Sequence, residues 1–446
     1  MTEWKTEITS LARAMLCGDL TESSIVQVLQ ELIEDTASRS QATPPLWMIK
    51  LASRVAGKYG PARPRLARLV SFLASDQALK RQLKKDTVRV HPSCRTEQFS
   101  ETAQLVTSAM PFDTVRDVAE WLGISLRELD WFADRRQLEA KRQIIRSRNY
   151  HYRWIPKSDG RYRLVEAPKP RLRDIQRRLL RAVFQHLPVH SAAHGFRRQH
   201  SIVSCVDPHV GAAVILKLDV QDFFPSLEPW RLWSLLRRCG YAERVAEVLT
   251  AICSNTVPRD VLDQCPATGN AQKYAQRLLY QRNHFPQGAP TSPCAANLCA
   301  WRLDTRLQAL AQTSQGRYTR YADDLIFSWP DQSAVTPGSF LPFAGTILFE
   351  EGLTPNFRKT KIMTQGQSQR VLGLVINQRA NTPRREYENL KAILHNCVQH
   401  GPEFQNTDGH ANFRAHLRGR IQFIESVNPN RSQRLQQAFD KIQWPT

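Results

Sequence analysis

The stretch Tyr318-Thr319-Arg320-Tyr321-Ala322-Asp323-Asp324-Leu325-Ile326-Phe327 places two adjacent carboxylates inside an apolar run that continues to Trp329. The flanking apolar and aromatic residues predict two short β-strands, with the acidic pair on or beside a tight hairpin turn. Carboxylate oxygens are the ligands that hard divalent cations prefer. The stretch therefore indicates a metal site, and a plain surface hairpin with an acidic turn is the alternative.

About a hundred residues upstream, Val214-Ile215-Leu216-Lys217-Leu218-Asp219 is a β-branched and leucine-rich run that ends in an acid. Such a run predicts a buried strand that brings Asp219 to the end of a sheet, where it joins Asp323 and Asp324. Clustered carboxylates repel one another, whereas two Mg²⁺ ions about 3.5–4 Å apart convert them into a clamp for in-line phosphoryl displacement. The chemistry that this trio indicates is nucleotidyl transfer.

Further motifs follow in an order that resembles the prokaryotic reverse transcriptases of the retron and group II intron type. The resemblance covers residues from about 114 to the C-terminus. It is carried by Ile155-Pro156-Lys157, Gly160-Arg161-Tyr162-Arg163, Ala167-Pro168, Gln176, His194-Gly195-Phe196, Leu218 to Ser226, Pro286-Gln287-Gly288-Ala289-Pro290-Thr291-Ser292-Pro293, Asn297, Tyr321 to Asp324, Lys359 to Lys361 and Val371-Leu372-Gly373-Leu374.

The resemblance implies an α+β fold, the right-hand polymerase of fingers, palm and thumb, with an added N-terminal helical region. We expect an N-terminal helical extension over 1–112, fingers with leading helices over 113–215, a palm over 216–380 and a helical thumb over 381–446. Within the palm, the polar segment 254–285 is expected to be an irregular surface insertion. We expect no nuclease, maturase or RNase H domain after the thumb.

Where motif residues match, the family's roles carry over by resemblance. Asp219, Asp323 and Asp324 resemble the catalytic metal ligands of the palm. The other matches imply substrate-binding roles: the triphosphate for Lys157 and Arg163, the nucleotide pocket for Gln287 and Gly288, the gate beneath the sugar for Phe224, and a position near the catalytic centre for Lys361.

These assignments have structural alternatives. The alternative for Lys157 and Arg163 is that they are solvated charges on an ordinary hairpin that turns at Gly160. Neighbouring residues of a strand face opposite ways, so we expect Phe223 to pack in the core and Phe224 to face the pocket. The segment from Pro286 to Pro293 also suits a rigid linker, although glycine at 288 allows close approach of a ligand.

Composition favours a nucleic-acid enzyme. The 446 residues include 62 Lys and Arg against 41 Asp and Glu, a net charge of +21. Residues 131–200 alone hold 18 basic and 5 acidic side chains, interleaved with Tyr150, Tyr152, Trp154 and Tyr162. Such a mixture suits phosphate neutralisation and base stacking, and a solvated basic helix is the alternative for Arg171 to Arg181. The chain shows no long apolar run or apolar leader, and its nine cysteines are scattered, so we expect a cytoplasmic protein with no membrane contact.

The flanking regions are predicted to be helical. One stripe is formed by Ile25, Val26, Leu29, Leu32 and Ile33, and a second by Leu66, Leu69, Val70 and Leu73. This extension either docks a partner or RNA, or braces the fingers. From Asp113 to Ala133 a helix ending at Gly123 is followed by a capping box, Ser125 to Glu128. A short helical pair before the fingers and a helix-turn-helix DNA reader both fit this pattern.

Placement within the family depends on two further patterns. Retron enzymes carry Asn-Ala-x-x-His before the first catalytic strand, where Cys205-Val206-Asp207-Pro208-His209 keeps only the histidine, and Val-Thr-Gly downstream, where Leu372 replaces threonine. Both departures bear on recognition of a cognate RNA. The segments Ala193 to Phe196, Phe223 to Ser226 and Thr319 to Tyr321 favour the retron type.

A retron enzyme starts DNA synthesis from a 2′-hydroxyl within its own structured noncoding RNA. It makes a branched RNA–DNA product and an RNA–DNA duplex, often in antiphage defence with an effector or toxin protein. The alternatives are another defence-associated or intron-derived reverse transcriptase with a different primer and template, and a non-catalytic RNA-binding protein with a polymerase shell.

Overall fold

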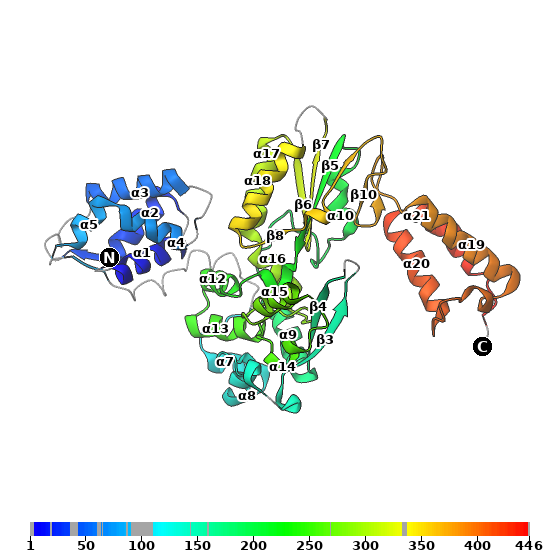
Figure 1. Ribbon diagram of the computed structural model, residues 1–446, viewed down its shortest axis with the longest axis horizontal. Helices are drawn as coiled ribbons and strands as arrows, with labels where there is room; N and C mark the ends of the chain where they lie inside the picture. The colour runs from blue at the N-terminus through cyan, green and yellow to red at the C-terminus, as the bar shows by residue number, and fades with distance from the viewer. Residues whose placement is uncertain are drawn as a thin grey trace. The chain divides into compact units, whose positions relative to one another are not determined.

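The structure is a computed structural model that describes residues 4–17, 20–35, 43–59, 64, 66–85, 88–90, 110–142, 144–157, 160–267, 269–331 and 337–444. It divides into two units, one comprising Met1–Pro188 with Leu227–Arg302 and the other Val189–Ser226 with Leu303–Thr446. Helices and strands both contribute, and the fold is the predicted α+β type (Figure 1).

The first unit begins with helices around their own apolar core. They are α1 (Lys5–Cys17), α2 (Glu22–Leu32), α3 (Leu46–Tyr59), α4 (Leu66–Ser75) and α5 (Gln77–Leu83). Both predicted helical stripes are confirmed, because Ile25, Leu29, Leu69 and Leu73 lie in this buried cluster. Ile33 is the exception: it begins strand β1 (Ile33–Asp35), which pairs with β2 (Val88–Val90).

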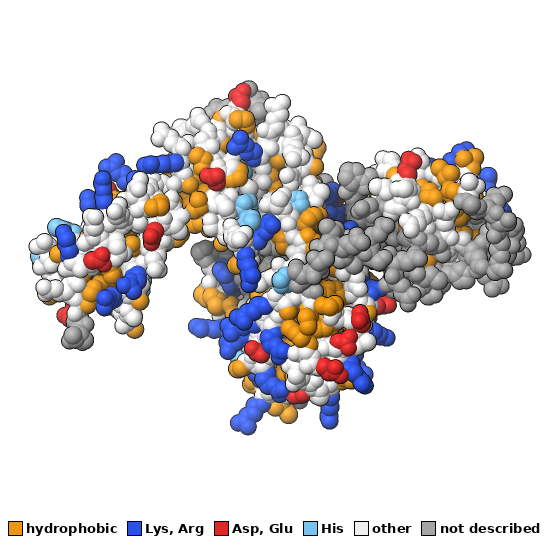
Figure 2. Space-filling view, turned by 180° about the vertical axis from the view of Figure 1, so that it is seen from behind, with side chains coloured by type: hydrophobic (Ala, Val, Ile, Leu, Met, Phe, Trp, Pro, Cys, Tyr) orange, Lys and Arg blue, Asp and Glu red, His pale blue; other side chains and the backbone are white. Residues whose placement is uncertain are grey.

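The basic region of the first unit combines a helical pair with a hairpin. Its elements are α7 (Val115–Leu122), α8 (Leu126–Ala133), η1 (Glu139–Lys141), η2 (Ile145–Ser147), β3 (Tyr150–Pro156), β4 (Tyr162–Pro168), α9 (Pro170–Ala182) and η3 (Phe184–His186). Gly123 ends α7 at φ 68° and the Ser125 to Glu128 capping box opens α8, as predicted. On α9 one face is buried and the arginines 171, 173, 177 and 181 are exposed. Basic side chains, blue in Figure 2, are numerous on the lower part of that view.

Strands β3 and β4 form an antiparallel hairpin, and helices from later in the chain belong to the same unit. Those helices are α12 (Trp230–Arg238), α13 (Glu243–Ile252), α14 (Arg259–Asp263), α15 (Asn270–Tyr280) and α16 (Ser292–Cys299). The expectation of an irregular surface insertion over 254–285 is wrong. Val257, Val261, Leu262 and Tyr280 are buried in one cluster with Leu164 of β4. Their apolar side chains explain why this largely polar segment folds onto the hairpin.

The second unit is built on a five-stranded antiparallel sheet in the order β6-β7-β5-β8, with β9 also paired to β5. Its strands are β5 (Val214–Gln221), β6 (Arg317–Tyr321), β7 (Asp324–Trp329), β8 (Thr354–Pro355) and β9 (Lys361–Thr364). The predicted buried strand and acidic hairpin are therefore confirmed. Phe327 and Trp329 contact Phe340 of α18 (Pro337–Glu350). Ile326 joins a cluster on the opposite face, as the two-residue period of a strand requires.

The remaining elements of the second unit surround this sheet or follow it in sequence. Around it lie α10 (Ile202–Val206), η4 (Asp207–His209), α11 (Phe223–Ser226), α17 (Trp301–Thr313), η5 (Phe357–Lys359), β10 (Arg370–Val371) and β11 (Leu374–Val375). The predicted C-terminal helices are α19 (Arg384–His400), α20 (Phe413–Val427) and α21 (Pro429–Phe439), with η6 (Glu403–Gln405) between them. They share a separate core that includes Leu390, Leu394, Leu417 and Ile421.

Two negative findings hold for the described residues. None of their helices combines the length and apolar character that a membrane crossing requires. Seven cysteines, those whose side chains the structure describes, are free thiols, at positions 205, 239, 253, 265, 294, 299 and 397.

Candidate active site

The strand register of the second unit brings the three predicted carboxylates together. Asp219 of β5 is the direct cross-strand partner of Asp324 on β7. Asp323 occupies the two-residue turn between β6 and β7, and its carbonyl oxygen accepts a hydrogen bond from the Val220 amide at 2.9 Å. Directly paired residues of an antiparallel sheet lie about 4.5–5.5 Å apart. The sheet itself therefore assembles the acidic trio from distant parts of the sequence.

The turn that carries Asp323 is held from outside by the segment His194-Gly195-Phe196. The His194 amide donates to the Arg320 carbonyl oxygen at 2.9 Å. A Cβ placed on Gly195 would lie 2.8 Å from the Ala322 amide nitrogen, closer than side-chain carbons approach backbone. Ala322 has a positive φ of 55°, which places the turn in the left-handed region. The glycine is required here because another chain segment lies directly against the acidic turn.

Lysines balance two of the three carboxylates. Lys359 Nζ lies 3.3 Å from Asp219 Oδ2, and Lys217 Nζ lies 2.8 Å from Asp324 Oδ1. Asp219 Oδ1 also accepts a hydrogen bond from Asn356 Nδ2 at 2.8 Å. Lys359 remains about half exposed, with 54% of its side chain accessible. Its pairing with Asp219 is therefore one that water and other cations can compete for.

Burial and mutual repulsion act on the two acids of the hairpin. Burial raises the pKa of Asp323, and the negative charges of Asp324 and Asp219 raise it further. Burial likewise raises the pKa of Asp324, against the opposing effect of Lys217. Ionised carboxylates held this way are stabilised by any cation that approaches them.

The donor set of the three carboxylates fits a divalent cation. Among the described residues, no three acidic, histidine or cysteine side chains are grouped at metal-binding geometry. The reason is that Asp219 and Asp324 are directed onto their lysines. The oxygens nevertheless come from three carboxylates on adjacent backbone positions, which is the ligand type that Mg²⁺, Mn²⁺ and Ca²⁺ select.

A fully buried ion pair supports the hairpin from below. Arg320, the residue before Tyr321, donates from Nε and Nη2 to the two carboxylate oxygens of Asp304, at 2.7 Å each. Its Nη1 donates to the Ala322 carbonyl oxygen at 3.2 Å. The hydroxyl of Tyr318 completes the Asp304 contacts at 2.8 Å. This pair fixes the end of β6 and the beginning of the acidic turn.

His209 links the two strands of the hairpin from the opposite face. It is fully buried, its Nδ1 lies 2.6 Å from Ser328 Oγ on β7, and its Nε2 lies 2.8 Å from Thr319 Oγ1 on β6. Burial lowers the pKa of His209 to about 3, so the ring is neutral between two hydroxyls. The retained histidine of the retron pattern is thus a buried link within the sheet.

The second divergent pattern lies in the same cluster. Leu372 and Gly373 have positive φ values of 50° and 83° and form the turn between β10 and β11. Leu372 packs against the cluster that contains Cys205 and Val206. Tyr321 packs there too. Both departures from the retron patterns therefore meet beneath the acidic hairpin.

The two phenylalanines after β5 differ in exposure. Phe223 is 3% exposed, and the Arg320 guanidinium carbon lies 5.6 Å from the centre of the Phe223 ring. Phe224 is partly exposed and its ring lies 6.2 Å from that of Phe196. Phe223 is the buried one, as expected, but the expected cause is wrong. Both residues belong to helix α11, because the chain turns at Asp222 with φ 45° before the strand can continue.

The remaining predicted residues of the first unit come from two segments. Arg163 is exposed on β4, and Lys157 follows β3 at the hairpin end, where its amide donates to the Arg161 carbonyl oxygen at 2.7 Å. Gln287 and Gly288 follow His284 in a loop whose Gln287 carbonyl accepts from the Glu166 amide at 2.9 Å. The hairpin and the loop are therefore neighbours within this unit.

Three polar residues of the acidic site were not assigned from sequence. Lys361 was expected near the centre, and it is exposed opposite Lys217 in the β5–β9 register. The contacts to carboxylates are instead made by Lys217, Lys359 and Asn356. Lys217 was detectable, since it stands two residues before Asp219 and so shares its strand face. No signal in the sequence marks Asn356.

Comparison with known proteins agrees with this geometry. The family described as reverse transcriptase (RNA-dependent DNA polymerase) matches residues 155–376. The retron Mx65 reverse transcriptase of Myxococcus xanthus is 34% identical over 420 residues, which are 91% of this chain and 90% of that protein. The retron Mx162 reverse transcriptase of Myxococcus xanthus is 34% identical over 71% of this chain and 64% of its own length. The retron Ec86 reverse transcriptase of Escherichia coli is 30% identical over 70% of this chain and 87% of that protein.

A polymerase fold, an acidic β-hairpin and these matches define the protein as a reverse transcriptase, an RNA-directed DNA polymerase. Within that class, the chain belongs to the retron reverse transcriptases. The sequence-based prediction of the family is confirmed.

Proposed function

We propose that Asp219, Asp323 and Asp324 form the catalytic centre of this polymerase and hold two Mg²⁺ ions. The observation that carries the proposal is the register of the sheet, which pairs Asp219 with Asp324 and sets Asp323 in the adjoining turn. Bound divalent ions supply an activated hydroxyl nucleophile and neutralise charge on the phosphates in such sites. Lys217 and Lys359 place positive charge beside Asp324 and Asp219.

The predicted substrate residues are proposed to bind the incoming deoxynucleoside triphosphate. Lys157 and Arg163 contribute positive charge for its phosphates, and Gln287 and Gly288 line its pocket. Phe224 stands below the sugar, where its ring excludes a 2′-hydroxyl. Its partial exposure beside Phe196, with Phe223 buried, supports this gate assignment.

The cognate template and primer are proposed to be a structured noncoding RNA. The names of the relatives, all retron reverse transcriptases at 30–34% identity, support this reading. The product is then a DNA strand joined to RNA, held as an RNA–DNA duplex by the C-terminal helices. A cytoplasmic location, an effector protein and a role in antiphage defence complete the proposal.

Substitution of the acids tests the catalytic centre. We expect Asp323→Asn and Asp219→Ala each to lower Mg²⁺-dependent deoxynucleotide incorporation on a primed RNA template by about a thousandfold or more. RNA binding should persist. Asp130→Asn, at an exposed pair with Arg135, is the matched control and should retain activity. Incorporation near the wild-type rate in either acidic variant would refute the metal assignment.

The product tests the retron assignment separately. Nucleic acid that co-purifies with the protein from its native host should contain a DNase-sensitive strand covalently joined to RNA. Digestion with ribonuclease should shorten that species. The DNA that remains should still migrate more slowly in a gel than the same DNA strand without attached RNA. Recovery of RNA alone, or of unlinked DNA, contradicts the retron product while leaving the polymerase assignment intact.

A further inference from the structure

The nucleotide residues assigned to the first unit come from two chain segments that meet at Glu166. Lys157 and Arg163 belong to the β3–β4 hairpin, and Gln287 and Gly288 to a loop more than a hundred residues later. The Glu166 amide donates to the Gln287 carbonyl oxygen at 2.9 Å. A Cβ on Gly288, whose φ is 133°, would lie 2.9 Å from the Glu166 carbonyl oxygen. The backbone of Glu166 is thus in direct contact with the pocket loop.

The side chain of Glu166 forms an ion pair sealed inside the protein. Its Oε1 lies 2.8 Å from His284 Nε2, and both side chains are 0% exposed. Its Oε2 accepts from Asn255 Nδ2 at 2.7 Å. His284 and Asn255 also exchange backbone hydrogen bonds, at 2.9 and 3.0 Å. The carboxylate therefore ties β4 to the segment that leads directly into Gln287 and Gly288.

The hydrogen-bond partners of His284 suit a ring in which both nitrogens donate. Nδ1 lies 2.7 Å from the Arg282 carbonyl oxygen, which only accepts, and Nε2 faces the Glu166 carboxylate. Burial favours the neutral ring, but the Glu166 charge and hydrogen bond outweigh it and raise the pKa of His284. The ring of Tyr280 lies against it at 5.2 Å between centroids. The pair is therefore an imidazolium and a carboxylate.

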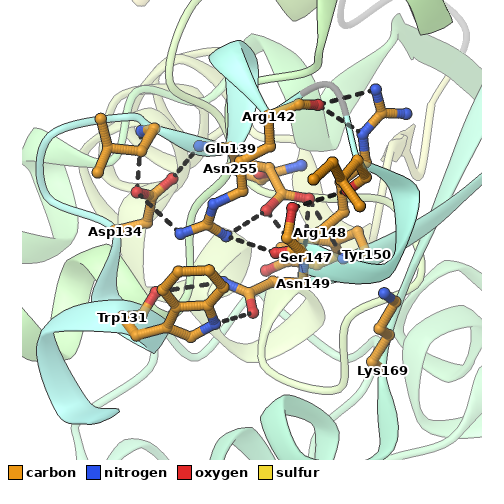
Figure 3. A network of polar contacts seen from close by, with 12 residues as sticks. Trp131, Asp134, Glu139, Arg142, Ser147, Arg148, Asn149, Tyr150, Lys169 and Asn255 are labelled. Carbon is orange, nitrogen blue, oxygen red and sulfur yellow. Dashed lines mark hydrogen bonds and ion pairs between the residues drawn. The ribbon is translucent and has the colours of Figure 1, made fainter. Parts of the chain in front are cut away.

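A chain of buried polar groups anchors this pair to the start of the hairpin. Asn255 Nδ2 donates to the Tyr152 hydroxyl at 3.1 Å, and that hydroxyl donates to Glu139 Oε1 at 3.1 Å. Glu139 in turn accepts from the Asn149 amide at 2.8 Å. Figure 3 shows Glu139 and Asn149 within this network, with Arg142 donating to Glu139. Glu166 thus has fixed partners on the side away from the pocket loop.

Stability alone is a weak reason for such a pair. Desolvation of two buried charges offsets much of their attraction, and well-packed apolar residues often replace buried pairs at no loss of stability. Directed hydrogen bonds, by contrast, hold two segments at one distance and orientation. Here the segments so held carry all four nucleotide residues assigned to this unit.

We propose that the Glu166–His284 pair is a positioning device that sets the Gln287–Gly288 loop against the β3–β4 hairpin for binding of the incoming deoxynucleoside triphosphate. The inference rests on the proposed assignment of those four residues. Neither member of the pair touches the substrate, since both are sealed from solvent. They act through the backbone at Glu166 and through the three residues that separate His284 from Gly288.

Steady-state kinetics with Glu166→Gln test the proposal on a primed RNA template with Mg²⁺. Glutamine keeps the shape of the side chain but not its charge. We expect the KM for dNTP to rise about 10- to 100-fold, with kcat changed by less than about threefold and the template affinity unchanged. Asn255→Ala, which removes one donor to the same carboxylate, should raise the KM in the same direction by a smaller factor.

Glu351→Gln is the matched control, because it makes the same chemical change in a buried ion pair, with Arg306 of the other unit, that lies outside this network. It should lower the thermal midpoint while leaving the KM for dNTP within about twofold. An unchanged KM in folded Glu166→Gln, or an equal rise in Glu351→Gln, overturns the positioning role. If Glu166→Gln does not fold, the KM of Asn255→Ala decides by the same criteria. An inactive wild type would instead contradict the proposed function.

Discussion

Each unit of the molecule carries one fully buried ion pair next to residues of the proposed site, and the two pairs differ in their cation. In the second unit Arg320 pairs with Asp304 beneath the acidic hairpin. In the first unit His284 pairs with Glu166 beside the nucleotide loop. All four side chains are 0% exposed. A guanidinium does not lose its proton at any pH a protein survives, whereas an imidazolium does.

Two ion pairs that are equally buried therefore need not respond equally to a change of pH. Burial lowers the pKa of Arg320, but Asp304 and Tyr318 raise it more, so the guanidinium keeps its proton. His284 has a raised pKa but an ordinary value near 6.5. The acidic hairpin is therefore supported by a permanent charge and the nucleotide loop by a titratable one.

The largest effect is expected from Asp304→Ala. The substitution leaves the Arg320 charge buried without a counter-ion, which should lower the free energy of unfolding by about 3–5 kcal/mol. Urea denaturation measures this change. Asp130→Ala at the exposed Arg135 pair is the control and should cost about 0–1 kcal/mol. A loss below about 1 kcal/mol for Asp304→Ala would show that Arg320 finds another partner or water, and would break the comparison.

A third buried group that can become a cation, His209, should make the stability of the protein depend on pH in the acid range. Its folded pKa of about 3 lies below its ordinary value of 6.5, and the positive charges of Arg317 and His194 add to the effect of burial. The unfolded chain therefore binds the proton more readily, so stability is full above pH 6.5 and falls as pH drops toward 3.

Glutamine at this position can still form hydrogen bonds but does not titrate. We expect His209→Gln to lose less free energy of unfolding than wild type as pH falls from 7 to 4, by about 2–4 kcal/mol. Denaturation at pH 4 and pH 7 supplies the measurement, and other carboxylates contribute equally to both proteins. An identical loss of stability between pH 7 and pH 4 in wild type and variant would mean that His209 is protonated inside the fold.

The alkaline side sharpens the contrast between the two pairs. Because the pKa of His284 is raised, its stabilising contribution is full below pH 6.5 and is lost as pH rises through the folded value. Wild type should therefore lose roughly 1–3 kcal/mol more than Glu166→Gln between pH 6.5 and pH 9. Equal slopes for the two proteins would show that the imidazolium does not titrate in this range.

The smallest energetic effect is expected from Phe224→Ala, at the residue whose ring lies beside that of Phe196. Removing the ring should relax discrimination against ribonucleotides by about tenfold in relative kcat/KM, equivalent to about 1.4 kcal/mol. Stability should change little compared with Phe223→Ala, because Phe223 is the buried member. Unchanged sugar selectivity would remove Phe224 from the gate position.

Sequence patterns predicted those parts of the fold that local periodicity and turn chemistry determine. The strand before Asp219, the hairpin around Asp323 and the capping box at Ser125 all follow from residue spacing. They failed where a few residues decide a local path. Asp222 adopts a positive φ and starts helix α11, and four apolar residues fold the polar segment 254–285 onto β4.

Long-range partners of the site were not predictable from one sequence. Glu166 and His284 are 118 residues apart, and neither has a local pattern that marks it as charged and buried. Asn356 reaches Asp219 from 137 residues away. Such contacts depend on which faces the tertiary fold brings together, whereas Lys217 shares a strand face with Asp219 and could have been found.

The free thiols have a practical consequence for spectroscopy. Five of the seven cysteines whose side chains are described are buried and the other two are half-buried. Burial raises the pKa of Cys205 and Cys239 to about 11 and of Cys253, Cys294 and Cys299 to about 12. Maleimide dyes react with thiolate, so a cysteine introduced at an exposed position in either unit should label well ahead of these native residues. Pairs of fluorophores placed this way would report nucleotide-dependent movements by energy transfer, with those seven sulfur atoms left in place.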